Sequence, residues 1–198
     1  MSFSVAKKLM VPFVWETVSA SNCVEWPFSK TGRIDEQLRR AVAGPRVYRF
    51  RYSDSAGRPV CYIGESEKFE RRFGDYLRTF KRVLSSKPTK DSTLEELEDA
   101  CKRNHTNAEV RVSAAILNAN LGDALVELQF LSFDEFVMNG ALIALDMLSD
   151  PFKRRAVENL AILDSESSGI RVINRGRDVT MKRLSSLLEK VKKHATQK

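Results

Sequence analysis

The sequence predicts an α+β fold in which a small, mainly antiparallel β-sheet is built on a hairpin over residues 46–63 and flanked by helices. Residues 46–52 read RVYRFRY, where apolar and basic side chains alternate with the period of two that is typical of a half-buried strand. In residues 66–83 the apolar side chains instead recur at helical spacing, and they are Phe69, Phe73, Leu77 and Phe80. These two patterns predict a hairpin with an amphipathic helix packed on it.

The rest of the hairpin follows from its turn. Residues 53–59 (SDSAGRP) carry the serine, aspartate, glycine and proline that favour a connection, and residues 60–63 (VCYI) indicate the returning strand. A helix is expected before the hairpin, over residues 33–43, and the breaker pair Gly44-Pro45 ends it.

Further helices and strands are expected along the second half of the chain, where later strands join the sheet. They are a helix from Ser92 to about Asn104 with Glu95 completing a capping box, strands over 110–117 and 125–133, two helices between Asp134 and Asp164 separated near Asp150-Pro151, a short strand over 169–173 and a last helix over 180–194.

Composition limits the kinds of partner. The 198 residues include 33 Lys and Arg against 26 Asp and Glu, a formal charge of +7 with a pI of about 9.4. That excess favours a polyanionic partner, although solvated cationic faces are also common. No segment approaches the roughly 18 apolar residues of a membrane helix, and no secretory signal is evident, so we expect a cytoplasmic protein without membrane contact.

Cysteine and histidine are too few for several kinds of site. Cys23, Cys61 and Cys101 are odd in number and far apart, which fits neither a disulfide framework nor paired zinc ligands. His105 and His194 are the only histidines, and neither lies near a cysteine. A histidine-based zinc site or a Ser-His-Asp triad is therefore not expected.

A set of tyrosine, arginine and acidic positions recurs in the predicted elements. Tyr48 lies in the first strand of the hairpin and Tyr62-Ile63-Gly64 in the second. Arg72 follows Tyr62 by ten residues, and Tyr76 is one helical turn later. Downstream, the segment RRAVENLAIL contains Glu158 and the segment VIN contains Asn174. In order and setting, these residues resemble the signature of the GIY-YIG nuclease family over residues 44–82 and 151–175.

The resemblance implies a metal-dependent DNA endonuclease that hydrolyses phosphodiester bonds. It implies that Tyr48 activates or orients the attacking water, that Tyr62 holds the nucleophile or phosphate, and that Arg72 binds the non-bridging oxygens. Tyr76 completes the implied catalytic set, while Gly64 is expected to have a substrate-binding or structural role. Arg46 departs from the family, which has glycine at this place in its first motif.

The implied cofactor is one Mg²⁺ ion, for which Mn²⁺ can substitute, held by Glu158. The spacing before this glutamate exceeds that of a minimal family member, so other carboxylates remain open; they are Glu127, Glu135 and Glu166. Glu65, directly after Gly64, is either a second acidic group near the metal or a solvated loop carboxylate.

The geometry of strands and helices also predicts that these side chains lie together, independently of the resemblance. Tyr48 and Tyr62 on neighbouring strands can place two phenols on one face of the sheet. Arg72 and Tyr76 are four residues apart and share one side of a helix. We therefore expect four polar tips to converge.

The resemblance also divides the chain. It indicates an N-terminal extension with one helix over residues 1–43, a GIY-YIG-like catalytic domain over 44–175 with an insertion at about 84–150, and a basic C-terminal helix over 176–198. Basic residues on two of the expected helices are candidates for binding the DNA backbone, and they are Arg71, Arg78, Lys81, Arg82, Lys182 and Arg183.

Structural interpretations of the same residues remain open. Tyr48 and Tyr62 also fit the alternative that they are ordinary aromatic core residues of a strand. Glu158 lies four residues after Arg154 and could form a surface ion pair with it. Asn174 could have the structural role of bracing a turn. Two other functions compete with the nuclease: a binding module of the same fold without catalysis, and an interaction protein with no nucleic-acid role. Substrate specificity and oligomeric state are left open.

Overall fold

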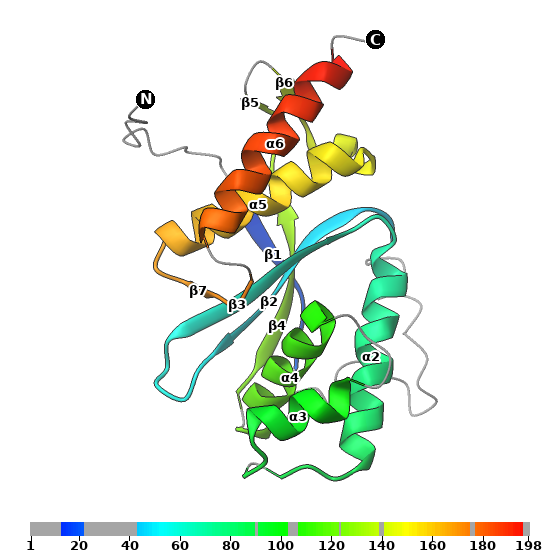
Figure 1. Ribbon diagram of the computed structural model, residues 1–198, viewed down its shortest axis with the longest axis vertical. Coiled ribbons are helices and arrows are strands. Elements are labelled where there is room, and N and C mark those ends of the chain that lie inside the picture. Colours follow the sequence, from blue (N-terminus) through cyan, green and yellow to red (C-terminus); the bar gives the residue numbers. More distant parts are fainter. Residues whose placement is uncertain are drawn as a thin grey trace.

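The computed structural model describes residues 13–21, 43–89, 91–102, 107–122, 124–138, 141–174 and 177–195. They form an α+β fold with a five-stranded, mostly antiparallel sheet and helices on both of its faces (Figure 1). The predicted fold class is confirmed at this level. No helix among the described residues is long and apolar enough to cross a membrane.

The predicted hairpin is the centre of the sheet. Strand β2 (Arg46–Ser53) pairs antiparallel with β3 (Pro59–Ser66), in the register that places Ser53 opposite Pro59. Asp54 shapes the turn, because its carboxylate accepts hydrogen bonds from the backbone N–H groups of Ala56 and Arg58, each at 2.9 Å.

Three further strands complete the sheet in the order β1-β4-β2-β3-β7. Strand β1 (Val14–Ser21) lies at one edge, and β4 (Val126–Ser132) lies between it and β2, both pairings being antiparallel. Strand β7 (Arg171–Val172) runs parallel to β3 at the other edge. A separate two-stranded sheet joins β5 (Phe136–Met138) to β6 (Ala141–Ile143).

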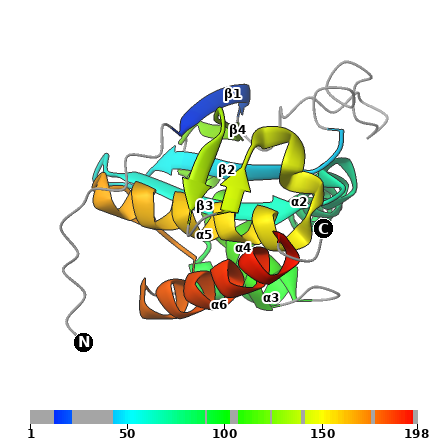
Figure 2. The same cartoon turned by 90° about the horizontal axis from the view of Figure 1, so that it is seen from above.

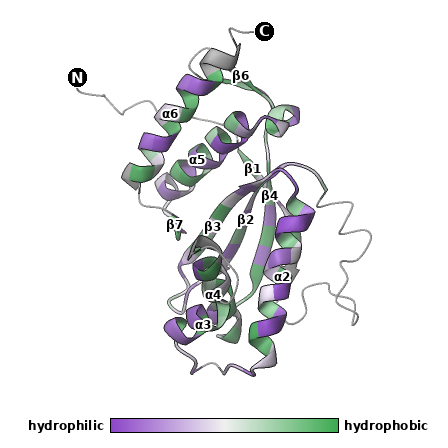
Figure 3. Cartoon of the chain, turned by 45° about the vertical axis from the view of Figure 1, so that its right-hand side comes forward, coloured by the Kyte–Doolittle hydropathy of each residue, from purple (hydrophilic) through white to green (hydrophobic). Residues whose placement is uncertain are grey.

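Helices cover the sheet, and bands of hydrophobic and hydrophilic residues alternate along α2 (Figure 3). The described helices are α2 (Phe69–Ser85), α3 (Leu94–Cys101), α4 (Asn107–Leu121), α5 (Pro151–Ser167), α6 (Arg177–Ala195) and the short 3-10 helix η1 (Leu145–Ser149).

The two faces of the sheet belong to two hydrophobic cores. Tyr48 and Phe50 of β2 point into a first core shared with α2, α3 and α4. Val47 of β2 and Ile63 of β3 point to the other face, into a second core shared with α5. Helix α6 lies outside α5, which separates it from the sheet (Figures 1 and 2).

One expected strand is wrong, because residues 110–117 lie inside helix α4. The segment contains valines and isoleucine, whose β-branched side chains favour strands. Its buried positions nevertheless include Val110, Ala114 and Leu117, which follow helical spacing, while Val112 and Ile116 are buried as well. Burial on more than one side hid the helical period from the sequence.

The expected first helix between residues 134 and 150 is also wrong. This stretch forms β5, β6 and η1. The sequence carries Asn139-Gly140 between the two strands, and Asn-Gly is a strong hairpin signal that outweighs the apolar pattern around it.

Most other expectations are confirmed within a few residues. Helix α5 begins at Pro151 with Asp150 as its cap, whose carboxylate accepts from two backbone N–H groups. The capping box of α3 is one residue later than expected, between Thr93 and Glu96. The strands at 125–133 and 169–173 and the last helix also form.

Several expectations lie outside the described residues. They concern the helix over 33–43, Cys23, His105 and the side chain of His194. The division into extension, catalytic domain and basic helix stays a prediction. The fold adds that β1 and β4, from the proposed extension and insertion, are strands of the main sheet.

Candidate active site

The three predicted tyrosines converge on one face of the sheet. The register places Tyr48 opposite Gly64 and Tyr62 opposite Phe50, so both phenols project into the same layer with ring centroids 6.3 Å apart. The hydroxyl oxygens of Tyr48 and Tyr76 are 3.2 Å apart, and Tyr76 also hydrogen-bonds to Tyr62. Strands β2 and β3 and helix α2 thus bring three hydroxyl groups together, as the spacing predicted.

Gly64 makes this cluster possible by having no side chain. A Cβ atom there would lie 2.7 Å from both the Cζ and the hydroxyl oxygen of Tyr48, and 3.0 Å from the ring of Tyr62. These separations are well below the roughly 3.5–4.0 Å of ordinary carbon contacts. The space above Gly64 is therefore filled by the Tyr48 ring, which gives this glycine a structural role.

The environment keeps the three hydroxyls protonated. Burial raises the pKa of Tyr48 well above the ordinary tyrosine value, and the neighbouring phenols add to the shift. Burial, followed by Tyr76 and Glu158, also raises the pKa of Tyr62 well above that value. The pKa of Tyr76 is raised because burial outweighs its hydrogen bonds and Arg72. At neutral pH these groups donate and accept hydrogen bonds and are not phenolates.

Arg72 brings a positive charge to the cluster from the first half of α2. Burial lowers its pKa, but the Coulombic attraction of Tyr48, Tyr76 and Tyr62 in their ionised forms raises it, and the net shift is upward. Its half-buried guanidinium is therefore charged within electrostatic reach of all three phenols. This arrangement matches the expected convergence of four polar tips.

Asn174 braces the edge of the sheet beside the cluster. Strand β7 pairs with β3 at Val60 and Cys61, and the N–H of Ile173 then donates to the Cys61 carbonyl at 2.9 Å. Beyond it, the side-chain amide of Asn174 takes the place of a strand backbone. Its Nδ2 donates to the Ile63 carbonyl at 2.5 Å, and its Oδ1 accepts from the Ile63 N–H at 2.8 Å. Asn174 is thus a brace on a strand, where the sequence had suggested a brace on a turn.

Glu158 reaches the same place from the second core. It lies on α5, and it lines one pocket together with Tyr62. Glu65 at the end of β3 anchors that helix, because it accepts from Nε of Arg154 at 2.5 Å and from Nε of Arg155 at 3.3 Å. Arg154 is almost fully buried in this contact. Glu65 is therefore not a solvated loop carboxylate, and it does not line the pocket that Glu158 lines.

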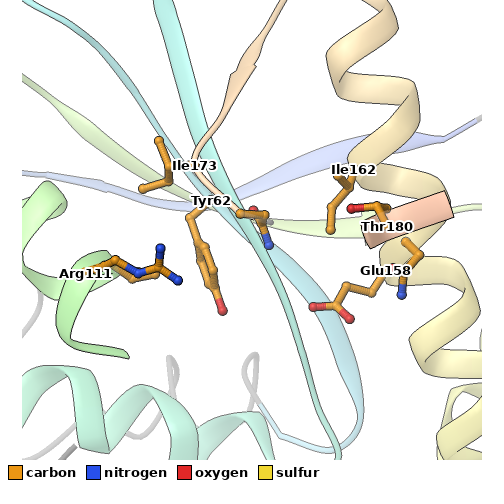
Figure 4. A pocket seen from close by; sticks show the side chains of 9 residues that line it. Tyr62, Arg111, Glu158, Ile162, Ile173 and Thr180 are labelled. Atoms are coloured by element: carbon orange, nitrogen blue, oxygen red, sulfur yellow. The ribbon is translucent and has the colours of Figure 1, made fainter. Parts of the chain in front are cut away.

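The pocket has a volume of about 50 Å³ and lies where helices from both faces meet at the edge of β3. In Figure 4 the ring of Tyr62 lies between Arg111 on one side and Glu158 on the other. Asn174 and the buried Thr180 also line it. Sequence reasoning missed Arg111 and Thr180. Arg111 carried no signal because its segment was expected to be a strand, and Thr180 stood only at the start of an expected helix.

The predicted DNA-binding residues occupy two helices in separate parts of the molecule, α2 and α6 (Figures 1 and 3). Arg82 donates to the backbone carbonyls of Ala100 and Cys101 at the end of α3, and Arg78 pairs with Asp75. The remaining four are exposed, and they are Arg71, Lys81, Lys182 and Arg183. The candidate DNA-binding residues are therefore divided between two separate helices.

The acidic groups of the pocket limit the metal it fits. Within the described part of the chain, no three His, Cys, Asp or Glu side chains gather as ligands, and Glu158 is the carboxylate that lines the pocket. Glu127 pairs instead with Arg51, and neither Glu135 nor Glu166 lines the pocket. Mg²⁺ often uses one or two protein carboxylates and completes its shell with water and phosphate oxygens. The donor set therefore fits Mg²⁺, whereas zinc needs more protein ligands.

Comparison with known proteins identifies no relative, because no family model, no curated protein and no solved structure matches the chain. The resemblance to GIY-YIG nucleases therefore stays a prediction.

Proposed function

We propose that this protein is a Mg²⁺-dependent endonuclease that hydrolyses phosphodiester bonds in DNA, with its active site at the edge of β3. The observation that carries the proposal is that Tyr62 lines a pocket with one carboxylate, Glu158, and also interacts with a buried phenol, Tyr76, and with one guanidinium, Arg72. These groups come from one strand and two helices that lie far apart in the sequence. Their convergence is expected of a site and not of scattered core or surface residues.

The side chains have roles that follow from their charge and exposure. Arg72 remains charged and is suited to bind the non-bridging oxygens of a phosphate, which gain negative charge during hydrolysis. Tyr62 is the tyrosine that lines the pocket, so its hydroxyl contacts the substrate or the attacking water. Tyr48 and Tyr76 lie behind it and hold that hydroxyl in place by hydrogen bonding. With its pKa raised, Tyr48 orients water through this chain and does not remove the proton itself.

Glu158 would hold the metal, since it is the carboxylate that faces Tyr62 across the pocket. When bound, Mg²⁺ lowers the pKa of coordinated water and stabilises charge on phosphate oxygens. Mn²⁺ uses the same oxygen ligands and is expected to substitute.

Cleavage of supercoiled plasmid DNA with Mg²⁺ tests this function. We expect nicked or linear product from the unaltered protein, and a loss of roughly 100-fold or more for Arg72→Ala and Glu158→Gln. Lys102→Ala is the control, because Lys102 is an exposed residue whose described ion pair is with Asp99 and which does not line the pocket. Absence of cleavage with both Mg²⁺ and Mn²⁺, or full cleavage by Glu158→Gln, contradicts the proposal.

A binding module without catalysis is the second candidate, and burial favours it. Tyr48 and Tyr76 are only 1% and 2% exposed, so two of the three phenols do not reach solvent. A binding module retains salt-dependent DNA affinity but shows no metal-dependent cleavage. The plasmid assay, run beside a binding measurement, separates the two functions.

A further inference from the structure

The pocket at Tyr62 is much smaller than the substrate that it would act on. Its volume of about 50 Å³ has room for a few water molecules or a metal ion with its waters. Pockets that enclose whole ligands measure roughly 300–1,000 Å³. Most of a nucleotide must therefore lie outside this pocket.

A larger groove adjoins the pocket and has the required size. Its volume is about 570 Å³, and it runs between the β2–β3 turn, helices α3 and α4, and β7. Two residues, Arg111 and Ile173, line both the groove and the pocket. The two spaces are therefore adjacent, and Arg111 stands at the place where they join.

Arg111 is well placed to hold a phosphate at that junction. It is an exposed residue of α4, and its guanidinium points towards the Tyr62 side of the pocket, opposite Glu158 (Figure 4). Arg72 interacts electrostatically with Tyr62 from α2, and Arg111 lines the pocket with Tyr62 from α4, so guanidinium groups on two helices approach this tyrosine. A planar guanidinium can bind two oxygens of one phosphate at once, through two parallel N–H···O hydrogen bonds.

The groove itself offers the groups that bind a nucleic-acid strand. Tyr52 is a half-buried aromatic ring on its wall, close enough to Arg171 for that cation to lower its pKa against the effect of burial. Arg58 lies at the turn, paired with Asp54, and Glu98 is the other acidic residue of the lining. Aromatic rings that stack on bases and cations that follow the backbone are the usual means of binding single strands.

We propose that Arg111 is a substrate-binding residue that holds a backbone phosphate at this junction, and that one unpaired strand of the nucleic acid lies in the groove. The strand then passes from Tyr62 to Tyr52 and Arg171, and the groove takes one or two of its nucleotides. This inference rests on the proposed function, because it names the part of the substrate that the site accepts. A groove of this size favours an unpaired strand over a duplex.

Binding in the absence of metal tests the inference without relying on cleavage. Fluorescence anisotropy, in EDTA, compares a labelled single-stranded 12-mer with the same sequence as a duplex. We expect tighter binding of the single strand, and a weakening of roughly ten-fold for Arg111→Ala. The slope of log affinity against log salt is expected to fall by about one for each phosphate contact that is lost. Arg111→Lys should restore part of the loss, and Arg171→Ala should weaken single-strand binding in the same way.

Lys102→Ala removes one positive charge outside the groove and is the matched control. Equal binding by Arg111→Ala and Lys102→Ala, or preference for the duplex, overturns the inference. If the native protein cleaves DNA and the Arg111→Ala variant cleaves it equally well, the inference is overturned and the nuclease proposal stands. Single-strand binding that depends on Arg111, in a protein that never cleaves, supports the groove and refutes the nuclease.

Discussion

Replacing Gly64 by alanine tests the close approach on which the tyrosine cluster depends. The backbone conformation of Gly64 is open to any residue, since its φ is not among the positive values found in the chain. The effect of the change is therefore steric. The new methyl group would lie 2.7 Å from Cζ and from the hydroxyl oxygen of Tyr48, a side chain that is 1% exposed.

The size of the effect follows from that overlap. To reach ordinary contact distance, the Tyr48 ring must move by about 0.8 Å. The ring is packed against Phe69 and Phe50, with centroids 4.5 and 5.8 Å away, so it cannot move without displacing other core side chains. Overpacking of this kind costs about 1–3 kcal/mol of the free energy of unfolding. For a chain of this length, that lowers Tm by about 2–4 °C per kcal/mol.

Denaturant unfolding and calorimetry measure this cost, and Gly74→Ala is the matched control. A Cβ at Gly74, inside α2, would meet only the end of the Arg78 side chain at 3.7 Å. Alanine is the better helix former, so Gly74→Ala should stabilise the protein by about 0.5–1 kcal/mol. Opposite signs for the two substitutions are expected. A change of less than about 0.5 kcal/mol for Gly64→Ala refutes the steric reasoning.

Three further predictions concern stability and titration. Asn174→Ala removes two hydrogen bonds to the backbone of Ile63 and should lower the unfolding free energy by about 1–3 kcal/mol, measured by denaturant titration; an unchanged midpoint would show that the brace contributes nothing. Glu65→Ala leaves the buried Arg154 without its carboxylate and should cost about 3–5 kcal/mol, against about 1 kcal/mol for disrupting the partly exposed Arg51–Glu127 pair; equal costs would contradict this. All four tyrosines of the chain have raised pKa values, so the ultraviolet absorbance of the folded protein should show no phenolate step near pH 10. Because the folded pKa values exceed the unfolded ones, the contribution of the protonated tyrosines to the free energy of unfolding is fully present below about pH 10 and is lost as the pH rises above it. A normal tyrosine titration in the folded state would refute the burial of the cluster.

Local patterns were sufficient to predict the part of the fold that carries the phenols. The alternation in residues 46–52 and the helical spacing in 66–83 arise from contacts within the hairpin and α2, and each period is uninterrupted. The convergence of Tyr48, Tyr62 and Tyr76 followed from those two periods together with the turn residues that predict the returning strand over 60–63. The sequence could therefore predict this half of the site from geometry.

The other half of the site depends on contacts that no local pattern reports. Arg111 reaches the pocket only because residues 107–121 form a helix, and the β-branched residues of that segment favoured a strand. Asn174 is a brace because β7 ends next to β3, a pairing between segments more than 100 positions apart. Glu65 stabilises α5 through Arg154, a partner that no spacing in the sequence identifies.

Successive side chains of β3 point to opposite faces of the sheet, and this decides which of them reach the candidate active site. Tyr62 points into the core that holds the phenols, while its neighbours Cys61 and Ile63 point into the core that carries Glu158. A slip of one residue in the pairing of β3 with β2 would exchange these faces and turn Tyr62 away from Arg72. The alignment of one pair of strands thus sets the distance between the acid and the phenols, and an insertion or deletion of a single residue in β3 would separate them while leaving every one of those side chains in the protein.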